Sequence, residues 1–109
     1  MGHGKAGQVA VIFISQRTDD DAQDYGAAAE EMVMLAARQP GYAGVRSVRD
    51  AAGLGITISY WEDEASAKAW RDHPRHCQIR EQGRGRWYEH YHIDVARITR
   101  SYGWSRDAV

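Results

Sequence analysis

The amino-acid sequence favours an α+β domain of the ferredoxin-like type, with the element order βαββαβ and an antiparallel sheet. The main indications are an apolar β-branched run at residues 9–15, an amphipathic helical pattern from Tyr25 to Ala36, and two strand-like segments on either side of residues 50–53. The 109 residues suit a single domain. We expect its core at about residues 8–102, between short flexible N- and C-terminal tails.

The first strand and the first helix follow from residue type and spacing. Residues 9–15 are almost all apolar, which predicts a strand that is covered on both faces. Thr18 and the aspartates that follow it offer capping oxygens and negative charge to a helix start. Apolar side chains then recur at helical spacing until Pro40-Gly41 stops the helix; they are Tyr25, Ala28, Ala29, Met32, Leu35 and Ala36.

The second half predicts a hairpin, a capped helix and a last strand. Residues 42–49 and 54–61 flank a turn that ends in Gly53, and Leu54, Ile56, Ile58 and Tyr60 share the face that we expect in the core. Asp63 caps a second helix, which Pro74 breaks or kinks before a short helical turn at 75–82. The last strand begins near Trp87, and a change of apolar parity predicts a bulge near Ala96-Arg97.

The predicted sheet has one face without a helix. Two helices cover a single face of such a sheet, yet residues 9–15 are apolar on both sides. An exposed apolar sheet face promotes aggregation unless something covers it. A second copy of the chain is the simplest cover, so we expect a homodimer.

Composition excludes several classes of partner. The 14 basic and 15 acidic side chains nearly cancel, so we expect no nucleic-acid binding. The longest apolar run, residues 9–14, is too short to cross a bilayer, and residues 1–7 have no apolar leader segment, so we expect no membrane association. A single cysteine, Cys77, cannot form an internal disulfide and suits a reducing compartment. The expected location is the cytoplasm.

Aromatic and imidazole side chains gather around the second predicted helix. Trp70 and His73 are one helical turn apart, and His76 follows after another three residues. Imidazole titrates near neutral pH, so both histidines are candidates for acid-base chemistry. Trp70 is alternatively a core residue, and His73 alternatively binds free carbonyls at a helix end. We expect no metal site, because no acidic or cysteine partner stands at a recognisable ligand spacing.

Two further histidines occupy the last predicted strand. His90 and His92 share one side of it, and Tyr91 lies on the other side. That histidine side is therefore solvent-facing, cavity-lining or interfacial. No motif for an organic cofactor is visible, because the glycines at 83–85 precede a strand and do not lead from a strand into a helix.

Several segments resemble the antibiotic biosynthesis monooxygenase domain; they are Tyr60-Trp61-Glu62, Ala69-Trp70-Arg71, His73-Pro74-Arg75-His76, Trp87-Tyr88 and Tyr91. The resemblance runs roughly from Val9 to Tyr102. It implies a dimeric α+β barrel and a cofactor-independent monooxygenase that acts with dioxygen on a small aromatic or polyphenolic substrate. The residue chemistry and the resemblance together give His73 and His76 as candidate catalytic groups, and Trp70, Trp61, Ser66, Tyr91 and His90 as candidate substrate-binding residues.

The resemblance is not uniform over the site. In the polyphenol-oxidising branch of the family, an asparagine and a tyrosine stand where this chain has Ser66 and His76. In the haem-degrading branch, a histidine iron ligand stands where this chain has Arg80. The alternatives to a cofactor-independent monooxygenase are a non-catalytic dimeric module that binds a small molecule, a haem-degrading monooxygenase, and an isomerase or lyase that uses the same base.

Overall fold

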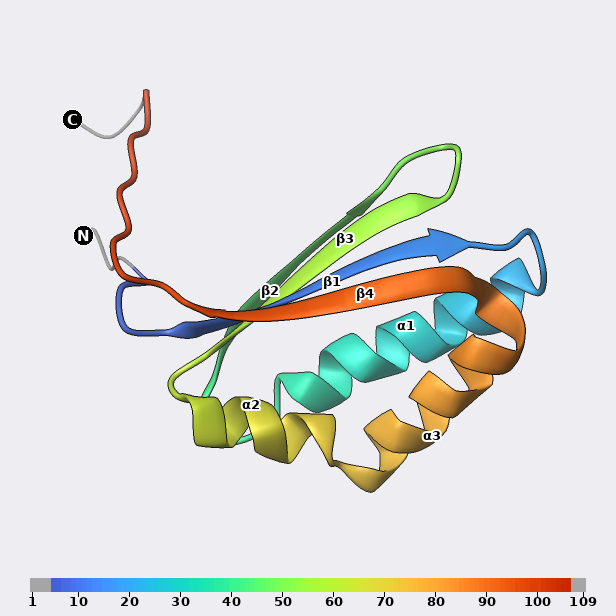
Figure 1. Ribbon diagram of the computed structural model, residues 1–109, viewed down its shortest axis with the longest axis horizontal. Helices are drawn as coiled ribbons and strands as arrows, with labels where there is room; N and C mark the ends of the chain where they lie inside the picture. The colour runs from blue at the N-terminus through green and yellow to red at the C-terminus, as the bar shows by residue number, and fades with distance from the viewer. Residues whose placement is uncertain (1–4, 107–109) are drawn as a thin grey trace.

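The computed structural model describes residues 5–106 and contains an antiparallel sheet with a layer of helices on one side (Figure 1). Residues 1–4 and 107–109, the ends of the predicted tails, lie outside the described residues. The elements are β1 (Val9–Arg17), α1 (Ala22–Ala36), β2 (Tyr42–Arg49), β3 (Leu54–Trp61), α2 (Glu64–Arg71), α3 (Pro74–Gln82), a π-helical turn η1 (Gly83–Trp87) and β4 (Tyr88–Arg97). The strand order β2-β3-β1-β4 is that of the predicted ferredoxin-like fold.

The helices cover the sheet face that carries Trp61. Val9 of β1 pairs with Trp61 of β3, and both belong to a buried cluster with Ala36 of α1 and Trp70 of α2. The strand period of two places Leu54, Ile56, Ile58 and Tyr60 on the opposite face. Our prediction that these four residues form the core was therefore wrong. Alternation separates the two faces of a strand, but it does not tell which face receives the helices.

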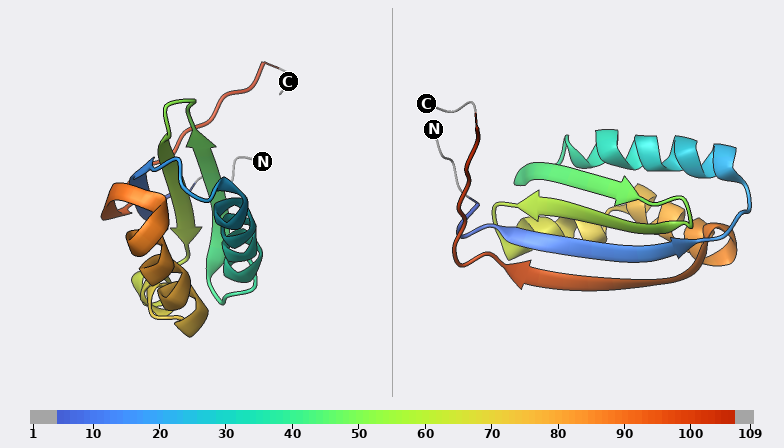
Figure 2. Two further views of the ribbon diagram at one scale, coloured as in Figure 1. Left: turned by 90° about the vertical axis from the view of Figure 1, so that its right-hand side faces the viewer. Right: turned by 90° about the horizontal axis from the view of Figure 1, so that it is seen from above.

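The opposite face, which we call the outer face, is apolar at its centre and is covered by none of the described helices. Figure 2 (right) looks onto this face, with the four strands in front and the helices behind. At its centre Ile12 of β1 pairs with Ile58 of β3, and Ile14 pairs with Ile56. Ile56 is 39% exposed and Val48, on the edge strand β2, is 70% exposed. The predicted apolar face without intramolecular cover is therefore present, formed by residues that we had expected in the core.

The hairpin and the helix boundaries largely follow the predictions. Gly53 has φ +95° in the turn between β2 and β3, as expected for a glycine there. The Asp63 carboxylate accepts a hydrogen bond from the Ser66 N–H at 2.8 Å, which confirms it as the cap of α2. At the start of α1, by contrast, the cap residue Asp21 makes no side-chain capping bond. The Thr18 hydroxyl instead accepts from the Asp20 N–H just before the helix.

The predicted bulge near Ala96-Arg97 is not present. The β1–β4 register is regular from Val9 opposite Arg97 to Gln16 opposite His90, and it shifts only at the other end, where Arg17 lies opposite Tyr88. The strand ends at Arg97. The change of apolar parity at Ile98 lies beyond the strand, where the Ile98 N–H donates to the Gln8 carbonyl.

Gly41→Ala should destabilise the fold because Gly41 has φ +84° and an added Cβ would overlap the side chain of Ser66. A left-handed backbone costs a residue other than glycine ~1–3 kcal/mol before the steric overlap is counted. Urea unfolding of the variant measures the loss. The matched control is Gly26→Ala in α1, where an added Cβ meets nothing within 4 Å. This control should gain up to ~1 kcal/mol from the higher helix propensity of alanine, so equal losses in the two variants would contradict the prediction.

Candidate functional site

The site is organised around Trp70, which α2 directs toward the sheet. Its indole stacks on Trp61 from β3, with ring centroids 6.2 Å apart, and on His76 from α3, with centroids 4.3 Å apart. Trp61 is fully buried and Trp70 is 8% exposed. The helix break before Pro74 turns the chain so that His76 of α3 reaches the Trp70 ring on α2. Tertiary packing thus brings Trp61, Trp70 and His76 into one stack.

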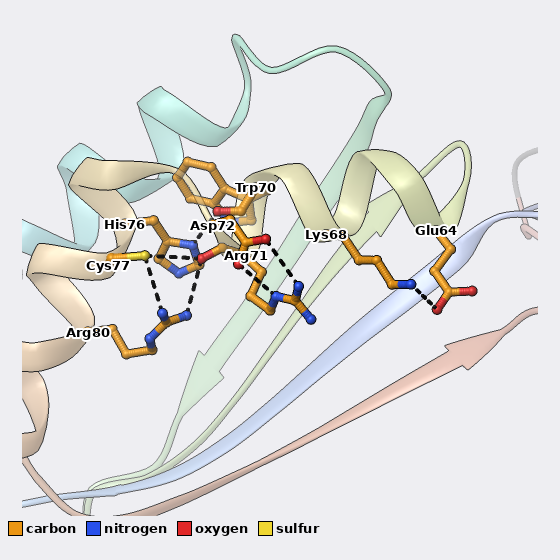
Figure 3. A network of polar contacts seen from close by, with 8 residues as sticks. All are labelled: Glu64, Lys68, Trp70, Arg71, Asp72, His76, Cys77 and Arg80. Atoms are coloured by element: carbon orange, nitrogen blue, oxygen red, sulfur yellow. Dashed lines mark hydrogen bonds and ion pairs between the residues drawn. The ribbon is translucent and has the colours of Figure 1, made fainter.

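The hydrogen bonding of His76 suits it to act as a base. Its Nδ1 lies 2.9 Å from the Trp70 carbonyl oxygen (Figure 3), and a carbonyl only accepts, so Nδ1 carries the proton in this bond. In the neutral ring, Nε2 then holds the free lone pair. Burial lowers the pKa of His76 below its ordinary value of 6.5, outweighing the bond to the Trp70 carbonyl, which acts in the opposite direction. At neutral pH the ring is therefore uncharged and able to take up a proton.

His73 is bonded in a different way. It is the cap residue of α3, and its Nδ1 accepts from the Arg75 N–H at 3.2 Å. Its ring lies 5.7 Å from that of Trp70, centroid to centroid. Since Nδ1 is an acceptor, the neutral ring carries its proton on Nε2 and has no lone pair to offer there. Of the two predicted catalytic histidines, only His76 is arranged as a base, and His73 starts a helix where we had considered that it ends one.

Ser66 and Trp61 border the same stack but have local partners. Ser66 stands one helical turn before Trp70 on α2 and packs against Gly41. The Trp61 indole N–H donates to the Ser59 hydroxyl at 3.0 Å, so the polar atom of this buried ring is satisfied. Trp61 therefore presents its apolar ring to Trp70.

Tyr91 and His90, the other two predicted binding residues, lie away from Trp70. Tyr91 pairs with Ser15, whereas Trp61 pairs with Val9, so their positions are six residues apart along β1, about 20 Å of strand. His90 pairs with Gln16 and is exposed on the outer face. The seven predicted site residues therefore fall into three places.

A second cluster surrounds Tyr91 on the helix side of the sheet, and sequence reasoning had missed most of it. Arg49 of β2 donates from Nη2 to the hydroxyls of Ser15 at 2.9 Å and of Tyr25 at 3.0 Å. Burial, together with a hydrogen bond to Tyr25, raises the pKa of Tyr88. The aromatic members are Phe13, Tyr25, Trp87, Tyr88 and Tyr91. Ser15 was the available signal, since it is a polar residue in an otherwise apolar strand and is fully buried.

A hollow of about 240 Å³ lies between α1 and α3, next to the second cluster. Arg75 of α3 forms a bidentate ion pair with Glu31 of α1 across it, at 2.6 and 2.8 Å. Trp87 also lines the hollow and is 3% exposed. Among the described residues no acceptor stands within hydrogen-bond distance of its indole N–H. The hollow thus has the Arg75–Glu31 ion pair at its rim and the Trp87 ring in its wall, and the Trp87 indole N–H is available to donate a hydrogen bond.

Arg80 has a structural part in the turn between α2 and α3. Its guanidinium donates to the Arg71 carbonyl oxygen and to the Cys77 sulfur, each at 3.3 Å (Figure 3). It thereby ties α3 to the C-terminus of α2, where free carbonyls accumulate. Within residues 5–106 no group of three or more histidine, cysteine, aspartate or glutamate side chains is arranged to hold a metal ion.

Comparison with known proteins identifies relatives. A model of the antibiotic biosynthesis monooxygenase family matches residues 8–82. The uncharacterized protein YqjZ of Bacillus subtilis is 50% identical over 91 residues, which cover 84% of this chain and 79% of that protein. Jasmonate monooxygenase ABM of Pyricularia oryzae is 37% identical over 49 residues, which cover 45% of this chain and 23% of that protein.

Solved structures with the same architecture include SnoaB, a cofactor-independent oxygenase from Streptomyces nogalater. It superimposes with a TM-score of 0.69 at 17% identity, covering 86% of this chain and 97% of that one. The fold is therefore of the ferredoxin-like α+β class that such proteins share. The chain belongs to the antibiotic biosynthesis monooxygenase family. None of the helices in residues 5–106 is both long and apolar enough to cross a membrane.

Proposed function

We propose that the protein is a cofactor-independent monooxygenase that acts with dioxygen on a small aromatic or polyphenolic substrate. The observation that carries the proposal is His76, a half-buried imidazole that stacks on Trp70 and bonds the Trp70 carbonyl through Nδ1, which leaves the Nε2 lone pair without a partner among the described residues. The family supports this class of reaction, and SnoaB, which has the same architecture, is a cofactor-independent oxygenase.

In the proposed reaction, His76 Nε2 removes the proton of a substrate phenol or enol. The resulting anion is rich enough in electrons to reduce dioxygen directly, so no separate electron carrier is required. At a CH₂ carbon conjugated with the anion, one oxygen atom of O₂ becomes a carbonyl oxygen. The other oxygen atom leaves as water with the two hydrogens. The buried rings of Trp61 and Trp70 keep solvent water from the anion.

Replacing His76 by glutamine should remove the base while keeping a polar side chain of similar length. We expect oxygen uptake with anthrone- and quinol-type substrates to fall by ~10²–10⁴-fold, as is usual when a general base is lost. In the parent protein the rate should rise with pH through the lowered pKa of His76, because only the neutral ring accepts a proton. The rate should therefore reach its plateau at a lower pH than it would with an ordinary histidine as base. An oxygen electrode measures both.

The matched control is His73→Gln, which changes a histidine bonded to the start of α3. It should retain most of the activity, since His73 Nδ1 is already an acceptor. Equal rates in the parent and both variants would exclude His76 as the base. If the parent consumed no oxygen with any substrate of the panel, the chain would instead be a non-catalytic module that binds a small molecule.

We also propose that the protein is a homodimer in which two outer faces pack against each other as an α+β barrel. The support is the apolar outer face itself, with Ile12, Ile14, Ile56 and Ile58 at its centre and no helix over it (Figure 2). Sheets that pack face to face lie about 10 Å apart and interdigitate side chains of this size. The cytoplasm remains the proposed location, because Cys77 has no second cysteine in the chain.

A further inference from the structure

The segment after β4 leaves the domain as an extended arm. Ile98 is the last of the described residues to exchange backbone hydrogen bonds with the body of the protein, donating to the Gln8 carbonyl and accepting from the Gly7 N–H. We call residues 99–106 the C-terminal arm. It has no helix or strand structure, and Figure 1 shows it extending from the sheet in red.

The C-terminal arm exposes two large aromatic side chains. Tyr102 is 85% exposed and Trp104 is 84% exposed. The other three of the four tryptophans, Trp61, Trp70 and Trp87, are at most 8% exposed. An aromatic side chain buries ~150–250 Å² when it packs, and tyrosine and tryptophan are enriched where proteins bind each other. Two such rings on one short segment indicate a surface that binds a partner.

The direction of the arm indicates which partner. In Figure 1 the arm rises on the side of the sheet opposite to the helices, which is the side of the outer face. Figure 2 (right), which looks onto that face, places the arm at one end of the strands. Any body seated on the outer face therefore stands beside the arm. The apolar outer face and the aromatic arm border the same space, so a single partner seated there would contact both.

The length of the arm agrees with a second copy as that partner. Eight extended residues span at most ~26–29 Å, whereas two packed sheets lie ~10 Å apart. The arm is thus long enough to pass the sheet of a facing copy and reach its flank.

We propose that the C-terminal arm clasps a second copy of the chain, with Trp104 and Tyr102 packed against the partner subunit. This inference rests on the proposed dimer but is separate from it, because two outer faces can pair whether or not the arms take part. In a symmetric dimer each arm would bind the other subunit, so the contact forms twice.

Trp104 provides its own reporter, since the other three tryptophans are already buried. Acrylamide quenching of the parent and of Trp104→Phe gives the Trp104 contribution by difference. We expect Trp104 to be shielded at concentrations where sedimentation shows a dimer, and to become fully quenchable on dilution to monomer. Tyr102→Ala combined with Trp104→Ala should weaken dimerisation by at least ~10-fold, since tryptophan and tyrosine are enriched among the few interface residues that dominate binding.

Three results would overturn the clasp. A dimer in which Trp104 stays fully quenchable would leave the outer-face dimer standing and remove the arm from it. Shielding of Trp104 that is equal in monomer and dimer would place the arm on its own subunit. A parent protein that is monomeric at every concentration would remove both the dimer and the clasp.

Discussion

Replacing Ile58 by aspartate should dissociate the proposed dimer into monomers at micromolar concentrations. Ile58 pairs with Ile12 at the centre of the outer face, so a face-to-face dimer would bury the new carboxylate of each subunit. Arg46 of β2 lies opposite position 58 and can pair with the new carboxylate, but both charges must lose their hydration in the interface, so we expect affinity to fall by at least ~10-fold for each copy. Sedimentation equilibrium of the parent and the variant measures the change.

The control for this experiment is Val33→Asp, which makes the same kind of change on α1. Val33 is 46% exposed and belongs to the helix layer on the other side of the sheet. This variant should dimerise like the parent. A parent that stays monomeric, or an Ile58→Asp variant that dimerises as tightly as Val33→Asp, would refute the barrel arrangement.

Trp70→Ala should strongly destabilise the fold. The indole is 8% exposed, belongs to the buried cluster with Val9 and Trp61, and stacks on His76. Truncating such a ring costs ~3–5 kcal/mol, through lost burial and the cavity that remains. Urea unfolding measures the loss. From the sequence we expected the main effect on ligand binding; the packing of Trp70 adds a large effect on folding.

Two further variants separate these effects. Trp104→Ala makes the same chemical change at an exposed position and should leave the stability of the monomer nearly unchanged. Trp70→Phe keeps an aromatic ring in the core, so a loss of ligand binding that exceeds its loss of stability would identify Trp70 as a pocket wall. A loss of under ~1 kcal/mol in Trp70→Ala would contradict the core role.

The separation of the two histidines has a consequence for how the site works. His76 depends on α2 for its Nδ1 partner and on Trp70 for its stacking surface. Arg80 ties the same two helices together from the next turn of α3. The proposed base is thus oriented by a helix junction that the break at Pro74 creates, and the short segment between Arg71 and Pro74 sets its position.

Much of the fold was readable from the sequence because its signals are local. The apolar run at 9–15, the helical spacing from Tyr25 to Ala36, the glycine turn at Gly53 and the cap at Asp63 each act over a few residues. The sequence segments that resembled the family also identified it correctly, since a family model matches residues 8–82. Local spacing placed His73 one helical turn from Trp70, whereas the stack of His76 on Trp70 depends on the turn between α2 and α3.

The tertiary structure decided what depends on contacts between distant residues. Both faces of β1 are apolar, so periodicity did not tell which face the helices cover. In the structure the helices cover the face with Trp61, and Ile56 and Ile58 lie on the outer face. Strand register placed Tyr91 opposite Ser15, far from Trp61, and let Arg49 bind Ser15 and Tyr25. The sequence alone determined the elements and the family, because propensity and spacing act within one segment; register and packing join segments, and no single segment encodes them.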